Sequence, residues 1–216
     1  MLHHTTFQIA ETSSSIQDPD VRALLTESHK GGMTFYPADA MIYNQGDATG
    51  ALYLVEFGTV RVLKVTADGR RQITAFCFPG DVFGLEPGDE HEFCAESVDG
   101  AGVRVLRAAN EAGFAYRLLS LALRRFARMQ AHLVLLGRMS ANEKMASFLL
   151  ELLERQGGDD IVTLPMQRND IADYLGITFE TVSRVLRVLK DRAIIRLKSV
   201  DCIEILDEEA LRDLQD

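Results

Sequence analysis

The chain has 216 residues, which is enough for two modest domains that each bury a core. Hydrophobic residues make up 47% of it, and no apolar run approaches the roughly 20 residues that a membrane span needs. The first residues show no basic stretch followed by an apolar one, so we expect no secretory signal, no membrane partner and a cytoplasmic location.

The formal net charge of −9 would argue against a nucleic-acid-binding protein if it were evenly spread, but it is not. Residues 162–200 hold seven Lys and Arg against four Asp and Glu, whereas residues 1–110 hold eight against fifteen and residues 201–216 one against seven. A positive segment in an acidic protein predicts modest, salt-sensitive affinity for any DNA, with specificity that depends on base contacts.

The N-terminal part is expected to be a loose leader with one short helix over residues 18–28, opened by Asp18 and Pro19. Residues 32–108 then alternate short β-branched segments with glycine-marked turns, and Gly46 stands in a polar loop where it favours a left-handed backbone. This pattern predicts an antiparallel barrel or jelly roll of about eight strands.

A long helix is predicted next, from about Asn110 to Gly137, where we expect a hinge between the domains. Apolar residues recur along one side of it at spacings of four and three, as in a coiled-coil seam: Ala122, Phe126, Met129, Leu133 and Leu136. Three arginines lie off this seam: Arg124, Arg125 and Arg128. The seam predicts pairing with a second copy in a homodimer; the alternative is that it packs onto the β-roll alone.

Ser140 and Glu143 match a capping box and predict a new helix with an apolar face, which ends near the run QGGDD at 156–160. The most informative stretch follows at 168–189, RNDIADYLGITFETVSRVLRVL, which predicts a helix-turn-helix. Its first helix turns Ile171, Ala172 and Leu175 inward, Gly176 makes the turn, Thr178 caps the second helix, and that helix buries Val182, Leu186 and Leu189.

The other face of the second helix is polar and carries Glu180, Ser183, Arg184 and Arg187. A carboxylate accepts from cytosine N4 and a guanidinium donates to guanine O6 and N7, so Glu180 and Arg184 are predicted to read neighbouring base pairs in a major groove. The alternative is an ordinary surface helix with solvated charges. Residues 194–206, IIRLKSVDCIEIL, predict a β-hairpin or wing on which Lys198 either reaches a phosphate or is simply solvated, and Asp207 is expected to cap a short last helix.

Cys77, Cys94 and Cys202 are widely separated and show no metal-ligand spacing, so we interpret them as buried, reduced thiols. A role for one of them in sensing oxidation stays open, because reactivity depends on exposure and local charge. The five histidines are equally scattered, and no metal site or cofactor is expected.

In this order, a β-roll, a long helix, a hinge and a winged helix-turn-helix resemble the CRP/FNR family of bacterial transcription regulators over nearly the full length. The resemblance implies an α+β protein with a cyclic-nucleotide-binding-like β-roll at 1–110, a dimerisation helix and hinge at 111–138, and a DNA-binding domain at 139–216. The stretch LPMQRNDIADYLGITFETVSRVL at 164–186 is similar to the FNR and FixK branches, in which an E-x-x-S-R pattern reads DNA.

That pattern falls here on Glu180, Ser183 and Arg184, preceded by Phe179, which could pack on a thymine methyl although the family usually has a smaller residue there. The resemblance implies a homodimer on a palindrome of the TTGA and TCAA type in double-stranded DNA, with the recognition helices roughly 34 Å apart. The phosphate contacts would come from Arg168, Thr178, Thr181 and Gln167, each of which could instead be a cap or a solvated side chain.

Family members that hold a cyclic nucleotide use a Gly-Glu pair and an Arg-Ser pair, but residues 83–97 here read FGLEPGDEHEFCAES, in which only Glu86 echoes the first acid. Four acids in this stretch are expected to repel a phosphate: Asp89, Glu90, Glu92 and Glu96. Residues 1–76 contain no cysteine, so an iron-sulfur sensor of the FNR kind is not expected either.

These departures point to the FixK-like branch, which controls genes for low-oxygen respiration, nitrogen fixation or denitrification. We therefore expect an activator that needs no small effector and contacts RNA polymerase. The alternatives are a regulator gated by a ligand or by oxidation, and a repressor. An enzyme is not expected, because no phosphate-binding loop, G-x-S-x-G or H-E-x-x-H motif is present.

Overall fold

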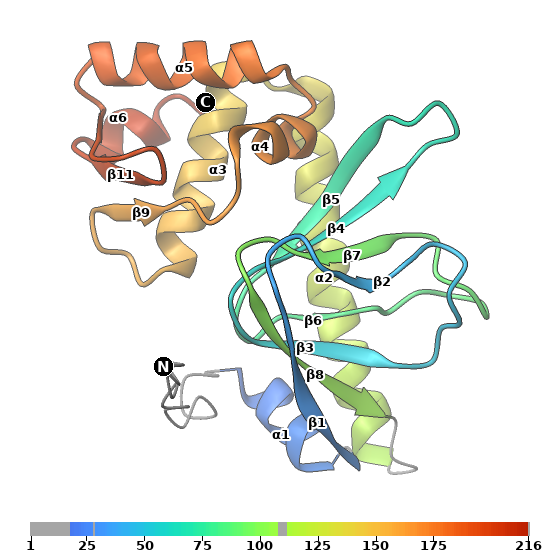
Figure 1. Cartoon of the computed structure of the whole chain (residues 1–216). Coiled ribbons are helices and arrows are strands. Elements are labelled where there is room, and N and C mark those ends of the chain that lie inside the picture. Colours follow the sequence, from blue (N-terminus) through green and yellow to red (C-terminus); the bar gives the residue numbers. More distant parts are fainter. Residues whose placement is uncertain (1–17, 28, 108–111, 216) are drawn as a thin grey trace, which may run out of the picture.

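The computed structural model describes residues 18–27, 29–107 and 112–215 and places an antiparallel β-roll and a helical domain on the two ends of one long helix (Figure 1). Helix α1 (Pro19–Glu27) begins as predicted, because Oδ1 of Asp18 accepts from the backbone N–H of Asp20 at 2.9 Å. Ser28, the predicted end of this helix, and Asn110, the predicted start of the long helix, lie outside the described residues.

The β-roll consists of two four-stranded antiparallel sheets. One has the order β1-β8-β3-β6, with β1 (His29–Tyr36), β8 (Ala101–Arg107), β3 (Leu52–Phe57) and β6 (Val82–Phe83). The other has the order β2-β7-β4-β5, with β2 (Met41–Tyr43), β7 (Cys94–Ser97), β4 (Val60–Val65) and β5 (Arg71–Cys77). The predicted eight-stranded jelly roll is confirmed.

The turn between β3 and β4 depends on a glycine. Gly58 has φ +74°, and a Cβ built there would lie 2.0 Å from the carbonyl oxygen of Gly100, so no other residue fits without moving the backbone. Gly46 also has a positive φ, +87°, as its place in the polar loop predicted.

Helix α2 (Ala112–Arg138) is fastened to α1 and to the β-roll by the arginines that lie off the apolar seam. Arg124 contacts Asp18 at 3.1 Å and Asp20 at 3.0 Å, and Arg128 Nη1 lies 3.1 Å from Asp81 Oδ1. The helix runs through Gly137 to Arg138 without a break at the predicted hinge. None of the helices in the described part of the chain is both long and apolar enough to cross a membrane.

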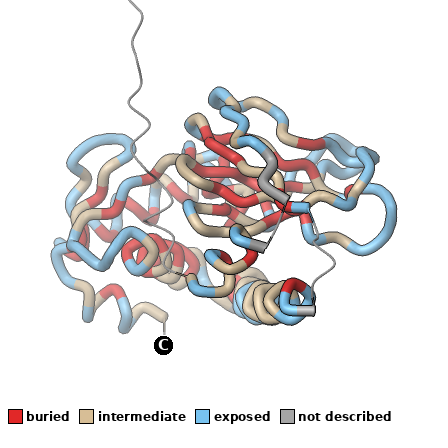
Figure 2. Tube along the Cα trace, turned by 90° about the horizontal axis from the view of Figure 1, so that it is seen from below, coloured by how far each residue is buried: buried red, intermediate tan, exposed pale blue. Residues whose placement is uncertain are grey.

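The predicted seam is largely exposed along α2. Phe126, Met129 and Leu133 are 51%, 53% and 61% exposed, while Ala122 is intermediate. Leu136, at the end of the predicted seam, is half-buried and packs against the core that includes the helical domain of its own chain. Figure 2 shows the same pattern, with buried residues concentrated in the two domains and α2 mostly exposed or intermediate.

The helical domain begins with α3 (Ala141–Arg155), whose predicted capping box between Ser140 and Glu143 is present. It continues with β9 (Ile161–Thr163), α4 (Arg168–Leu175), α5 (Phe179–Asp191), β10 (Ile195–Leu197), β11 (Cys202–Ile205) and α6 (Glu208–Arg212). The three strands form one antiparallel sheet in the order β10-β11-β9, in which β10 and β11 are the predicted wing, and Asp207 caps α6.

Candidate nucleic-acid interface

The two helices of the helix-turn-helix are joined at a left-handed glycine. Gly176 has φ +61° and ends α4, and the hydroxyl of Thr178 accepts from the backbone N–H of Thr181 to cap α5 at 3.2 Å. The apolar residues that were predicted to face inward are all buried: Ile171, Ala172, Leu175, Val182, Leu186 and Leu189. The predicted helix-turn-helix is therefore confirmed in its turn, its cap and its buried face.

Helix α5 lies at the end of the molecule remote from α1 (Figure 1), and its polar face is exposed. Glu180, Arg184 and Arg187 are exposed, and Arg184 Nη2 lies 3.4 Å from the hydroxyl of Thr181. Hydrogen bonds from its own backbone N–H and from the Thr178 hydroxyl hold the pKa of Glu180 below its usual value. Glu180 is therefore a carboxylate that only accepts, as a contact with a cytosine amino group requires.

Two further candidates for base contact differ in exposure. Phe179 is 45% exposed and opens α5, where its ring is free to meet an apolar group such as a thymine methyl. Ser183 is half-buried, and its Oγ lies 3.4 Å from Nη1 of Arg168 at the start of α4. Ser183 thus sits at the junction of the two helices.

The candidate phosphate contacts surround this face. Gln167 is exposed at the N-terminal cap of α4 without capping it through its side chain, and Thr178 is exposed while Thr181 is half-buried. Lys198 is exposed on the wing, where its ammonium lies 3.7 Å from Oε1 of Glu204. A surface pair of this kind is weak, so Lys198 is free to exchange Glu204 for a phosphate.

Comparison with known proteins agrees with this geometry. The Crp-like helix-turn-helix domain matches residues 143–214, and the cyclic nucleotide-binding domain matches residues 33–97. The nitrogen fixation regulation protein FixK of Rhizobium meliloti is 45% identical over 179 residues, which cover 83% of this chain and 85% of the relative. FixK of Azorhizobium caulinodans is 38% identical over 209 residues, covering 91% and 84%.

Among solved structures, FixK2 from Bradyrhizobium japonicum superposes with a TM-score of 0.81 and 36% identity, covering 86% of this chain and 97% of that one. The chain belongs to the CRP/FNR family, in its FixK-like branch. It is a DNA-binding transcription regulator, and the CRP/FNR family is one of regulators rather than enzymes.

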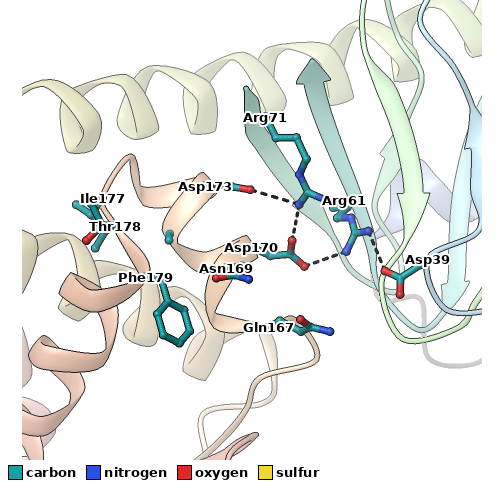
Figure 3. Close-up of a pocket in the computed structure, with 11 residues that line it drawn as sticks. Asp39, Arg61, Arg71, Gln167, Asn169, Asp170, Asp173, Ile177, Thr178 and Phe179 are labelled. Atoms are coloured by element: carbon teal, nitrogen blue, oxygen red, sulfur yellow. Dashed lines mark hydrogen bonds and ion pairs between the residues drawn. The ribbon is translucent and has the colours of Figure 1, made fainter. Parts of the chain in front are cut away.

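In this CRP/FNR protein the helix-turn-helix also contacts the β-roll, through side chains that sequence reasoning missed (Figure 3). Asp170 of α4 accepts at Oδ2 from Arg61 of β4 at 2.9 Å and at Oδ1 from Arg71 of β5 at 2.6 Å. The side chains of Asp170 and Arg61 are only 6% and 8% exposed. We call Arg61, Arg71 and Asp170 the interdomain clamp. No local sequence pattern reveals it, because Asp170 lies 109 positions from Arg61 and 99 positions from Arg71.

A cavity of about 470 Å³ lies between the β-roll and α2. Part of its lining comes from the segment that matches the cyclic nucleotide-binding domain. Of the acids in residues 83–97, Glu86 lines it. The four acids that were predicted to repel a phosphate do not line this cavity: Glu96 bonds Arg61, Glu92 pairs with Lys64, and Asp89 and Glu90 are exposed. The arginines that line the cavity have protein partners instead, such as Asp81 for Arg128 and Arg155.

The carboxylate of Glu86 has polar partners in its own loop. Its Oε1 lies 2.9 Å from Nδ1 of the buried His91, and its Oε2 accepts from the backbone N–H of Glu92 at 2.6 Å. Both carboxylate oxygens therefore have partners inside the β-roll, which hold this side chain in place.

The three cysteines differ in how far they are buried. Cys77 and Cys94 are buried as predicted, but Cys202 is partly exposed on β11, so the prediction of three buried thiols is wrong for it. Burial raises the pKa of Cys77 to about 12, which keeps this thiol protonated and unreactive.

Proposed function

We propose that the chain acts as a homodimer that binds a palindrome of the TTGA and TCAA type and activates transcription from it. The proposal rests on the exposed polar face of α5, which presents the anionic Glu180 one turn from the exposed Arg184. In the proposed complex Glu180, Ser183, Arg184 and Phe179 contact bases.

Phosphate contacts then set the register of the helix on the duplex. We assign them to Arg168, Gln167, Thr178, Thr181 and Lys198, which lie around the base-reading face on α4, α5 and the wing. Each contributes a hydrogen bond or a charge without regard to sequence.

The homodimer is supported by the exposed apolar side of α2. Phe126, Met129 and Leu133 leave more than half of each side chain in water, next to the exposed Leu119 and Leu123 on the same helix. A contiguous apolar stripe of this kind is unfavourable in a monomer and is removed from water when two copies pair.

Binding without a small effector is supported by the occupied groups in the β-roll. Glu86 is held by His91 and by the backbone of Glu92, and Arg128 and Arg155 are held by Asp81. Because these side chains already have partners within the chain, we propose that the protein binds DNA without a ligand to hold them in place.

The biological setting is proposed from the relatives, two of which are named as nitrogen fixation regulation proteins. We propose that the chain controls genes for low-oxygen respiration, nitrogen fixation or denitrification in the cytoplasm, where it meets DNA and RNA polymerase.

Fluorescence anisotropy with purified protein and a labelled TTGA–TCAA duplex tests the proposal. Without any additive, binding is expected at nanomolar concentrations and should weaken strongly on a scrambled duplex. Equal affinity for both duplexes would overturn sequence-specific recognition. Binding that appears only after addition of cell metabolites, or only under reductant, would favour the regulator gated by a ligand or by oxidation.

A further inference from the structure

The interdomain clamp is anchored firmly on the β-roll. Arg61 donates through Nε to Glu96 at 2.7 Å and through Nη2 to Asp39 at 2.9 Å, in addition to its bond with Asp170. Burial opposes the charge of Arg61, but the hydrogen bond to Glu96 and the charge of Asp170 outweigh it and raise its pKa. The guanidinium is thus held on all sides and presents one fixed edge to α4.

The clamp reaches α4 at a second point. Arg71 also lies 3.4 Å from Oδ2 of Asp173, and Nε2 of Gln72 donates to the carbonyl oxygen of Asp173 at 2.5 Å. A cavity of about 540 Å³ lies beside these contacts and is edged by Thr178 and Phe179 (Figure 3). Open space adjoins the start of α5 on this side, and the polar contacts act together with the apolar packing of α4 on β5 to dock the helix-turn-helix.

A continuous series of contacts then links the proposed dimer helix to the recognition helix. Arg124 and Arg128 fasten α2 to α1 and the β-roll, and the clamp fastens the β-roll to α4. The buried Ile171 of α4 and Val182 of α5 belong to one core, so α5 moves with α4. The orientation of each recognition helix relative to the dimer helix is therefore set partly by the clamp.

From this geometry we infer that Arg61, Arg71 and Asp170 are positioning residues, which fix the separation of the two recognition helices and thereby the spacing of half-sites that the dimer accepts. The inference rests on the proposed function, since it requires a homodimer that reads two half-sites. In this arrangement the polar face of α5 stays exposed, so the clamp holds the domain in a position that is open to DNA.

Arg71→Gln is the test variant, because Arg71 is 35% exposed and its loss leaves Asp170 bonded to Arg61. Arg70→Gln is the matched control, because it removes the same charge at the preceding residue. Arg70 is 83% exposed and pairs with Asp68 in its own turn. Affinities are measured on palindromes with half-site centres about 10 base pairs apart, or one base pair closer or farther, and on a single half-site.

Wild-type protein and Arg70→Gln are expected to prefer one spacing strongly. For Arg71→Gln the ratio of affinities between preferred and shifted spacing should fall about tenfold, because avidity is lost when geometry no longer favours simultaneous engagement. The affinity of Arg71→Gln for a single half-site should hardly change. A general loss of folded protein would lower this affinity too, so the single half-site separates the two causes. Asp170→Asn is expected to act in the same direction.

An unchanged spacing ratio in folded Arg71→Gln, or an equal fall in Arg70→Gln, would overturn the inference. Tighter binding of Arg71→Gln at the preferred spacing would also overturn it, since the clamp would then hold the domain away from DNA. A wild-type dimer with no spacing preference would overturn the proposed palindrome itself, so the two failures are distinguishable.

Discussion

Nη1 of Arg168 lies 3.4 Å from Oγ of Ser183, so the first residue of α4 touches the recognition helix at one of its candidate base-reading positions. Arg168 is half-buried, and its buried Nε has no hydrogen-bond partner among the described residues. The N–H donors of its two Nη atoms are the ones from which an entering phosphate oxygen would accept.

We therefore expect Arg168→Ala to weaken binding about equally on cognate and unrelated DNA. The slope of log affinity against log salt concentration should become shallower by about one, as for the loss of one phosphate contact. Titrations at several salt concentrations measure this, with Arg212→Ala on α6 as the control that leaves the slope unchanged. A normal slope with lost specificity would instead assign Arg168 to orienting Ser183.

Glu180→Ala and Arg184→Ala are expected to cost about 1 to 3 kcal/mol each on the cognate palindrome and to relax the preference at one base pair. Each removes a charged tip from the exposed face of α5 without touching its core. Affinities on duplexes with single-base changes check this. Glu209→Ala and Arg212→Ala on α6 are the charge-matched controls, and full retention of base preference in both test variants would contradict the assignment.

The helix-turn-helix could be predicted from sequence because its signals are local. The spacing of Val182, Leu186 and Leu189 places them on one helical face, and Gly176 and Thr178 mark a helix end and a helix start. Each of these features involves residues within one or two turns, so no tertiary information is needed to interpret them.

The clamp could not be predicted, because Arg61 and Asp170 are 109 positions apart and each alone would be expected on the surface. They are buried together because each compensates the charge of the other, with help from Glu96 and Asp39 around Arg61 and from Arg71 beside Asp170. Leu136 illustrates the same limit: its spacing fits the seam, but spacing does not reveal that it packs against the core of the helix-turn-helix domain in the same chain. Nor could the sequence show which acids of residues 83–97 line the cavity, because loop sequence does not fix which way a side chain points.

Phe126→Lys is expected to give monomers, because it places a charge in the middle of the exposed seam of α2, which the proposed dimer buries. Sedimentation should show about half of the wild-type mass, with binding to a palindrome reduced to that of a single half-site. Phe35→Lys makes the same change at another exposed phenylalanine, on β1 of the β-roll, and serves as the control. A dimer of unchanged stability in Phe126→Lys would exclude the seam as the interface.

Alkylation should separate the cysteines and thereby test gating by oxidation. Cys202 is partly exposed, whereas Cys77 is buried and burial raises its pKa to about 12, so almost no thiolate is present. With iodoacetamide at neutral pH, mass spectrometry should find Cys202 modified first and Cys77 protected until the protein unfolds. Cys202→Ser should bind DNA equally in air and under reductant. Rapid labelling of native Cys77, or a loss of binding in air that requires Cys77, would contradict this.

His132 links α2 to the helix-turn-helix, because its ring stacks on Tyr174 of α4 with centroids 4.2 Å apart. Its Nε2 is buried and has no hydrogen-bond partner in the part of the chain that the structure describes. Desolvation lowers the pKa of His132; the backbone of Tyr174 opposes this and the charge of Lys144 adds to it. The folded protein therefore holds the neutral ring under conditions in which the unfolded chain binds a proton.

Since the unfolded histidine titrates near pH 6.5, this contribution to stability is complete above that pH and is lost as the pH falls toward the lower folded value. His132→Phe keeps an aromatic ring against Tyr174 but has no proton to bind. Urea unfolding between pH 5 and 8 should therefore show that the free energy of unfolding falls less steeply with falling pH in the variant than in the wild type. The two slopes should differ by less than the one-proton limit of about 1.4 kcal/mol per pH unit, because the ring is partly hydrated. Parallel curves for the two proteins would mean that His132 does not carry this pH dependence.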